Sequence, residues 1–280
     1  MIDQNTQKTM NSQYNPEGSV LRNIQLNLLD ILVEFDRVCR KNGIRYWLDS
    51  GTLLGAMRHG GFIPWDDDLD ICILRKDYRK LIRILDNDLE YPFKLNELRS
   101  SNGRDAVNHV PISRVINRSF LVSRKKDKDG NPIYEPIWID IFPLENGSLR
   151  MKRFVEKTYG KLLRRKVYMI QDGTFKHFLS AVLEPLCIPL FLPLRWYGRI
   201  FHKSAYTHDF GIDFNSIRLK KDIFPLSECA FEGKTFLCPK DPDAYLTGIF
   251  GDWRKLPEEK DRITHHFNNY KIISDGTSRI

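Results

Sequence analysis

Closely spaced cysteines are missing from this sequence. The chain contains no Cys-X-X-Cys pair, so we do not expect a zinc site among its five cysteines, which are Cys39, Cys72, Cys187, Cys229 and Cys238. An odd number of cysteines, in a chain that begins with polar residues, favours reduced thiols in a cytoplasm. Cys229 and Cys238 flank a predicted hairpin turn at Gly233-Lys234, which would place the two sulfurs opposite each other, and we expect both to stay reduced.

A long, purely apolar run is also missing. Residues 1–6 are polar and do not have the pattern of a signal peptide. The longest apolar stretch, Phe178–Leu194, contains Glu184 and three prolines, which makes it a poor transmembrane helix. We expect this stretch to be buried or interfacial, and the protein to be cytoplasmic or peripheral on the cytoplasmic face of the membrane.

Acidic residues are outnumbered by basic ones, and the formal net charge is +8. This excess favours anionic partners, such as nucleotides, phosphorylated glycans, nucleic acid or an anionic membrane, without choosing between them. Nine basic residues lie between Arg150 and Lys176, before the apolar stretch, and Arg195, Trp196, Tyr197 and Arg199 follow it. Basic and aromatic flanks are typical of a peripheral contact with an anionic membrane, although the stretch could equally form the core of the second half.

The periodicity of the chain changes along its length. Residues 1–16 are polar and predicted to be loose. Residues 17–145 alternate helical and strand patterns, beginning with a helix that Ser19 caps and Gly43 ends, and including separate strands at 110–116 and 120–123. Residues 146–280 are predicted to be mainly helical and packed on the core. The sequence thus predicts an α/β (α+β) fold, with a small mixed sheet flanked by helices.

The segment Asp68-Leu69-Asp70-Ile71 carries the first candidate chemistry. Side chains alternate along a strand, so Asp68 and Asp70 would share one side while Leu69 and Ile71 enter the core. With Asp66 and Asp67 beside them, the carboxylates would repel one another, and a divalent cation would relieve that repulsion. All-oxygen ligands favour Mg²⁺ or Mn²⁺. A solvated acidic turn ahead of a strand is the alternative.

A further carboxylate stands alone in the apolar segment Trp138-Ile139-Asp140-Ile141-Phe142. An unpaired buried charge is costly, so we expect Asp140 to face the same metal from a neighbouring strand. Gly51-Thr52 precedes a predicted helix and could supply backbone N–H groups to a phosphate. Three carboxylates, a glycine turn and an excess of positive charge together indicate phosphoryl or nucleotidyl transfer.

At these residues the chain resembles a known family. The segment YWLDSGTLLGAMRHGGFIPWDDDLDI, from Tyr46 to Ile71, is similar to the signature of LicD proteins and their eukaryotic relatives, fukutin and the fukutin-related protein. The segment WIDIFPLE, from Trp138, resembles the second block of the family, and GDW followed by Arg262 and His265 resembles its end. The resemblance covers most of the chain and implies a nucleotidyltransferase-like core.

The resemblance also implies an activity, namely transfer of a phosphorylated small alcohol, such as phosphocholine, from a CDP-activated donor to a glycan or lipid-linked saccharide, with release of CMP. It implies that Asp68 and Asp70 are the paired metal ligands and Asp140 the third carboxylate, either as a base or only as a ligand. Gly51-Thr52 stands where the superfamily usually has Gly-Ser or Gly-Gly. The zinc-binding insertion of the fukutin-related protein has no counterpart in this cysteine pattern.

Four further residues are candidates for substrate binding. Arg58, at the end of the helix after the glycine turn, is a candidate phosphate contact, with a solvated surface arginine as the alternative. Trp65 could stack on a base or pack under the metal loop. Arg262 and His265 could bind a phosphate of the donor or the acceptor.

Other functions stay open at this point. The fold would also permit a nucleotidyltransferase that uses a nucleoside triphosphate, and a catalytically inactive module that binds glycan or nucleotide is a further alternative. Nucleic-acid binding has no support beyond the net charge, because no recognition motif is present.

Overall fold

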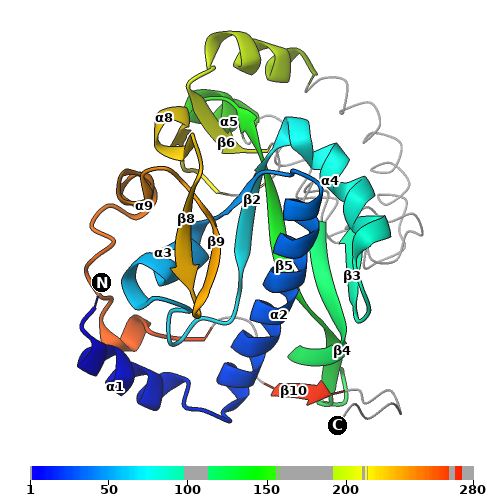
Figure 1. Cartoon of the computed structure of the whole chain (residues 1–280), viewed down its shortest axis with the longest axis vertical. Coiled ribbons are helices and arrows are strands. Elements are labelled where there is room, and N and C mark those ends of the chain that lie inside the picture. Colours follow the sequence, from blue (N-terminus) through cyan, green and yellow to red (C-terminus); the bar gives the residue numbers. More distant parts are fainter. Residues whose placement is uncertain are drawn as a thin grey trace.

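The computed structural model describes residues 2–97, 113–155, 157, 192–209, 212, 214–264 and 269–272 (Figure 1). Its helices are α1 Gln4–Tyr14, α2 Val20–Lys41, α3 Ser50–His59, α4 Arg75–Asp88, α5 Leu149–Val155, a helix over residues 192–201, α8 Lys220–Ile223, α9 Pro242–Phe250 and the 3-10 turn η3 Glu259–Asp261. Its strands are β1 Tyr46–Leu48, β2 Asp70–Leu74, β3 Phe93–Glu97, β4 Ser113–Lys126, β5 Pro132–Asn146, β6 Ala205–His208, β7 Arg218–Leu219, β8 Ser227–Phe231, β9 Lys234–Cys238 and β10 Asn269–Ile272.

One mixed sheet forms the centre of the molecule, in the order β1-β2-β5-β4-β10. β2 and β5 are parallel, whereas β1, β4 and β10 each run antiparallel to their neighbours. β3 pairs with β4, and β6 joins β5 to β7. Helices flank this sheet, so the predicted α/β class, a small mixed sheet flanked by helices, is confirmed.

The long helix α2 lies across β4 and β5 (Figure 1). Ser19 begins it as predicted, because its hydroxyl accepts a hydrogen bond from the backbone N–H of Arg22. Its apolar residues recur every three or four positions and are buried against the sheet. The helix ends before Gly43, whose φ of 62° lies in the region that glycine adopts without strain.

β4 is longer and more irregular than predicted. The strand runs from Ser113 to Lys126 without a break, with register shifts between Asn117 and Leu121 and between Ser123 and Lys125. At the first shift, the side-chain oxygen of Asn117 accepts hydrogen bonds from both the backbone N–H and the hydroxyl of Ser119. This local satisfaction of polar groups lets the strand continue through a bulge, where the sequence pattern predicts two separate strands.

The predicted loose N-terminus is wrong for residues 4–14, which form α1. Asp3 caps this helix by accepting a hydrogen bond from the backbone N–H of Thr6. Met10 is buried, and the ring of Tyr14 packs edge-on against Trp65 at 5.3 Å. Two apolar contacts and a cap hold a segment whose composition is otherwise polar.

The second half of the chain completes the central sheet. β5 extends to Asn146, across the predicted boundary between residues 145 and 146, and β6, β7 and β10 all come from beyond it. The division into residues 17–145 and 146–280 stays a prediction. Most of the apolar stretch Phe178–Leu194 and of the basic run before it lies outside the described residues. No helix in the described part of the chain has the length and apolar character that crossing a bilayer requires.

The hairpin of β8 and β9 turns one residue earlier than predicted. Its turn consists of Glu232 and Gly233, both with positive φ, at 49° and 72°. The cysteines of this hairpin therefore lie diagonally, because Cys229 pairs with Phe236 and Cys238 with Ser227. Both are free thiols, joined by a hydrogen bond between their side chains.

We predict that Gly55→Ala destabilises the protein. A Cβ at Gly55 would lie 2.4 Å from the carbonyl oxygen of Gly61 and 3.2 Å from the backbone nitrogen of Ile63, so α3 or the loop after it must shift. Overpacking of this kind costs about 1–3 kcal/mol, measurable as a lower free energy of unfolding in urea. The matched control is Gly248→Ala in α9, where the nearest atom would be 3.9 Å away. That control should be neutral or stabilising by up to about 1 kcal/mol. Equal effects of the two substitutions would contradict the prediction.

Candidate active site

The site begins at the turn between β1 and α3. Ser50 has a φ of 44°, a strained value for a residue with a side chain. Gly51 follows it, and a Cβ there would lie 3.0 Å from a carboxylate oxygen of Asp66. The hydroxyl of Thr52 accepts a 2.8 Å hydrogen bond from the backbone N–H of Asp70. The predicted glycine turn therefore lies directly against the acidic segment.

Asp70 and Asp140 stand opposite each other on the parallel strands β2 and β5. The backbone N–H of Asp140 donates to the carbonyl of Leu69 at 3.0 Å, which fixes this register. Adjacent strands are about 4.8 Å apart, so both aspartates start from the same edge of the site. The expected alternation also holds around Asp70, because Leu69 and Ile71 are buried in the core.

The carboxylates of this cluster interact strongly. Burial, together with repulsion from Asp68 and Asp140, raises the pKa of Asp70 well above its usual value. Burial and repulsion from Asp68 and Asp67 raise the pKa of Asp66 in the same way. The acidic segment is thus a group of carboxylates that oppose one another's ionisation.

Two donors orient the carboxylate of Asp140. The Nε of Arg114 donates to one oxygen at 2.7 Å, and the indole N–H of Trp138 donates to the other at 3.1 Å. The guanidinium of Arg114 also lies over the Trp138 ring, 4.2 Å from its centroid. The isolated charge in the apolar segment is therefore paired with Arg114, which stands opposite it on β4.

The donor types of this cluster suit a hard divalent cation, but among the described residues only Asp49, Cys72 and His208 bring three ligand atoms within 4.8 Å of one another. Asp66, Asp68, Asp70 and Asp140 offer only oxygen atoms, and the raised pKa values of two of them mark an excess of negative charge. Mg²⁺ and Mn²⁺ prefer such ligands and would remove the repulsion on binding.

A second cluster lies beneath the turn and is fully buried. Asp49, Cys72 and His208 offer ligand atoms within 4.8 Å of one another, a spacing that could hold a metal ion. Asp49 is already paired with a cation, because Arg218 donates to its two oxygens at 3.2 and 2.7 Å. The hydroxyl of Tyr245 donates to the same carboxylate at 2.6 Å. We therefore assign this cluster a structural role.

The electrostatics of the buried cluster agree with that role. Burial alone would raise the pKa of Asp49, but Arg218 and His208 hold it well below its usual value. Burial and the nearby charge of Arg218 lower the pKa of His208 to about 4, so its ring is neutral at pH 7. The result is one carboxylate balanced by one guanidinium at the base of the glycine turn.

Arg58 is buried rather than presented to a phosphate. Its side chain donates to the backbone carbonyls of Trp253 at 2.9 Å and Lys255 at 3.2 Å. Only 6% of the residue is exposed, and burial lowers its pKa to about 10. Arg58 therefore connects the end of α3 to the chain after α9, which neither sequence alternative anticipated.

Trp65 and Arg262 contact each other. The Arg262 guanidinium lies over the Trp65 ring at 5.4 Å, and Tyr14 and His59 pack against the same ring. Trp65 is buried, in agreement with the packing alternative. His265 lies outside the described residues.

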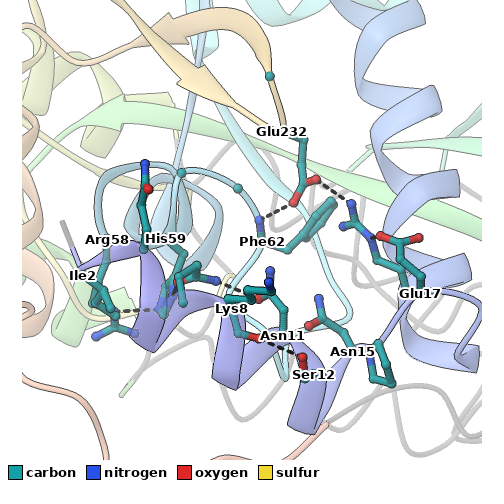
Figure 2. Close-up of a pocket in the computed structure, with 17 residues that line it drawn as sticks. Ile2, Lys8, Asn11, Ser12, Asn15, Glu17, Arg58, His59, Phe62 and Glu232 are labelled. Carbon is teal, nitrogen blue, oxygen red and sulfur yellow. Dashed lines mark hydrogen bonds and ion pairs between the residues drawn. The ribbon is translucent and has the colours of Figure 1, made fainter.

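A polar cavity of about 630 Å³ lies between α1 and the C-terminal end of α3 (Figure 2). In it, Glu232 accepts hydrogen bonds from Arg22 at 2.9 Å and from the backbone N–H of Phe62 at 3.1 Å. The His59 ring is hydrogen-bonded to Gln7 at 2.7 Å. These contacts fasten α1 and the β8–β9 hairpin to the end of α3.

Sequence reasoning missed Asp49, Arg114, Arg218 and Tyr245. Asp49 directly precedes the glycine turn and the helix after it, and this position could have marked Asp49 as part of the site. The alternation of β4 could have placed Arg114 on the side of Asp140. Arg218 and Tyr245 had no local signal, because their partner Asp49 lies 169 and 196 residues away.

Comparison with known proteins identifies relatives. Residues 43–105 match the family model described as LicD/FKTN/FKRP, nucleotidyltransferase domain. The chain is 27% identical over 277 residues to the lipopolysaccharide cholinephosphotransferase LicD of Haemophilus influenzae, covering 90% of this chain and 98% of that protein.

Two further relatives match shorter segments. An uncharacterized protein of Rickettsia typhi is 34% identical over 131 residues, which cover 46% of this chain and 39% of that protein. The human ribitol 5-phosphate transferase FKRP is 60% identical over 35 residues, which cover 12% of this chain and only 7% of that protein.

We predict that Arg218→Met destabilises the protein by about 3–5 kcal/mol, because it leaves the Asp49 carboxylate buried without its partner. Urea unfolding measures this loss. The double variant Asp49→Asn/Arg218→Met should recover part of it, since the orphaned charge is then removed. Arg254→Met is the matched control, because Arg254 and its partner Asp243 are exposed. That control should change stability by less than about 1 kcal/mol. An Arg218→Met variant as stable as the control would contradict the structural role.

Proposed function

Because this chain belongs to the LicD family, we propose that it transfers a phosphorylated small alcohol, such as phosphocholine, from a CDP-activated donor to a glycan or a lipid-linked saccharide. The observation that carries the proposal is the position of Asp70 and Asp140, side by side at the glycine turn. The relative that matches nearly end to end is a cholinephosphotransferase, which supports a choline-type donor.

The carboxylate cluster would hold Mg²⁺ or Mn²⁺, with Asp68, Asp70 and Asp140 as ligands and Asp66 beside them. When bound, such an ion supplies positive charge to the donor phosphates and to the departing CMP. Arg114 and Trp138 hold the Asp140 carboxylate in one orientation, so this ligand would not need to reorganise during the reaction.

In the proposed reaction the acceptor hydroxyl attacks the phosphorus that carries the small alcohol. A new P–O bond forms to the acceptor, the P–O bond to CMP breaks, and its electron pair leaves with CMP. The hydroxyl proton passes to a carboxylate of the cluster. Backbone N–H groups at the start of α3 face the donor phosphates, where the helix dipole favours negative charge. The phosphate contact first suggested for Arg58 has no part in this proposal, because Arg58 is bonded to backbone carbonyls.

Release of CMP from a panel of CDP-alcohols tests this function directly. The panel contains CDP-choline, CDP-ethanolamine and CDP-ribitol, with Mg²⁺ and a glycan acceptor. We expect CMP release that requires both the metal and the acceptor. A parallel reaction with nucleoside triphosphates should release no pyrophosphate, and pyrophosphate release without CMP release would favour the nucleotidyltransferase alternative instead.

We predict that Asp70→Asn folds but loses turnover by at least about a hundredfold, as expected when several kcal/mol of transition-state stabilisation are removed. Mg²⁺ together with the donor should raise the melting temperature of the unchanged protein but not that of the variant, because a ligand stabilises only the state that binds it. Asp86→Asn, on the exposed face of α4, is the matched control and should behave like the unchanged protein. A melting temperature that responds equally to metal and donor in Asp70→Asn would exclude Asp70 as a ligand.

A further inference from the structure

The helix of residues 192–201 presents an apolar face to solvent. Its large apolar residues are exposed to solvent. The exposed fractions are 58% for Leu192, 67% for Trp196, 46% for Tyr197, 38% for Ile200 and 65% for Phe201. Leu192, Trp196 and Ile200 recur every four residues, and so do Tyr197 and Phe201, so all five lie on one side of the helix. In Figure 1 this helix lies at the top of the molecule, away from α1. Contiguous exposed apolar surface of this kind marks an interaction site.

The opposite side of the same helix is firmly held. A Cβ at Gly198 would lie 2.2 Å from the carbonyl oxygen of Asn146, so the helix backbone directly contacts the end of β5. Arg195 donates to the buried Asp209 at 2.9 Å. The exposed aromatic face therefore belongs to a helix that is fixed in position.

A basic pocket of about 1000 Å³ lies beside this helix, at the ends of β2 and β5. The helix contributes Arg199 to its lining, and Lys203 follows directly after the helix. The six basic residues of the lining are Arg45, Arg75, Lys76, Arg199, Lys203 and Lys220.

Negative charge in this pocket is already neutralised. Its one carboxylate, Glu145, accepts from Arg199 at 3.1 Å, and Arg195 and Arg75 lie 3.5 and 3.9 Å from it. Four of the lining cations form no ion pair with any described residue, namely Arg45, Lys76, Lys203 and Lys220. All four are exposed. The pocket thus holds an uncompensated positive charge next to an apolar face.

We propose that the helix of residues 192–201 and the basic pocket beside it form a docking surface for an anionic lipid membrane. Trp196, Tyr197 and Phe201 enter the interfacial layer of the bilayer, where aromatic side chains are favoured. The lysines and arginines of the pocket take the phosphates of anionic lipid headgroups.

This surface lies at the other end of the strands that carry the candidate active site. Asp70 and Asp140 are paired in register, and so are Leu74 and Leu144 at the pocket. Four residues of strand separate the two pairs, a distance of roughly 13 Å. Membrane docking at this surface needs neither donor nor metal and is therefore independent of the proposed reaction.

Vesicle co-sedimentation of the full chain, in the presence of a chelator, tests the contribution of the apolar helix face to membrane binding. The full chain should bind vesicles that contain phosphatidylglycerol more tightly than vesicles of phosphatidylcholine alone. Trp196→Ser/Phe201→Ser should weaken binding at least about tenfold, because two large apolar side chains are lost from the interface. Ile133→Ser/Ile263→Ser is the matched control, since both residues are exposed elsewhere, by 49% and 54%. The control should bind as the unchanged protein does.

Charge variants test the pocket. Lys203→Gln/Lys220→Gln should weaken binding to the anionic vesicles roughly tenfold, since each surface cation contributes separately to the attraction. Lys94→Gln/Lys128→Gln, both on the exposed surface elsewhere, should have little effect. Raising the salt concentration from about 0.1 M to about 1 M shortens the screening length from about 10 Å to about 3 Å and should also weaken binding.

Three results would overturn the proposal. The first is vesicle binding that neither pair of variants weakens. The second is tight binding of inorganic pyrophosphate, measured by calorimetry, without any binding to vesicles, which would make the pocket a site for free anions. The third is a dimer in light scattering that Trp196→Ser/Phe201→Ser converts to a monomer, again without vesicle binding, which would assign the apolar face to a second copy of this chain.

Discussion

Asp49 and Arg218 lie 169 residues apart in the chain and meet in the interior, where the guanidinium donates to both carboxylate oxygens. Each ion alone would be costly to bury, so the pair forms only when both halves of the chain are folded around it. Asp49 directly precedes the strained Ser50 and the glycine turn. The geometry of the candidate active site therefore depends on a residue from β7, well outside the segment that carries the family resemblance.

Opposite charges gather at the two ends of β2 and β5. Carboxylates cluster where β2 begins, and burial together with their mutual repulsion raises the pKa values of Asp66 and Asp70. At the far end of the same strands, Arg75, Arg199 and Arg195 surround Glu145, and lysines that form no ion pair with a described residue line the pocket beyond. The residues of β2 and β5 between these two regions are buried and keep the opposite charges apart.

Several parts of the fold could be predicted because their causes are local. Ser19 caps α2 through a contact three residues away, and the alternation around Leu69, Asp70 and Ile71 follows from the geometry of any strand. The bulge at Asn117 and the helix α1 were not predicted. A side-chain hydrogen bond stabilises the bulge, and burial of Met10 together with the ring contact between Tyr14 and Trp65 holds α1, so neither depends on sequence periodicity.

The sequence by itself determined the α/β class and the glycine turn before a helix, since residue type and alternation suffice for these, and it proposed Asp68, Asp70 and Asp140 as candidate ligands. Tertiary structure alone decided the partners. Arg114 meets Asp140 only through the register of β4 on β5, and Arg58 reaches the carbonyls of Trp253 and Lys255 almost two hundred residues along the chain. The same long-range packing leaves one face of the helix at residues 192–201 exposed. The energy of such contacts depends on distances between segments far apart in sequence, and no local pattern records those distances.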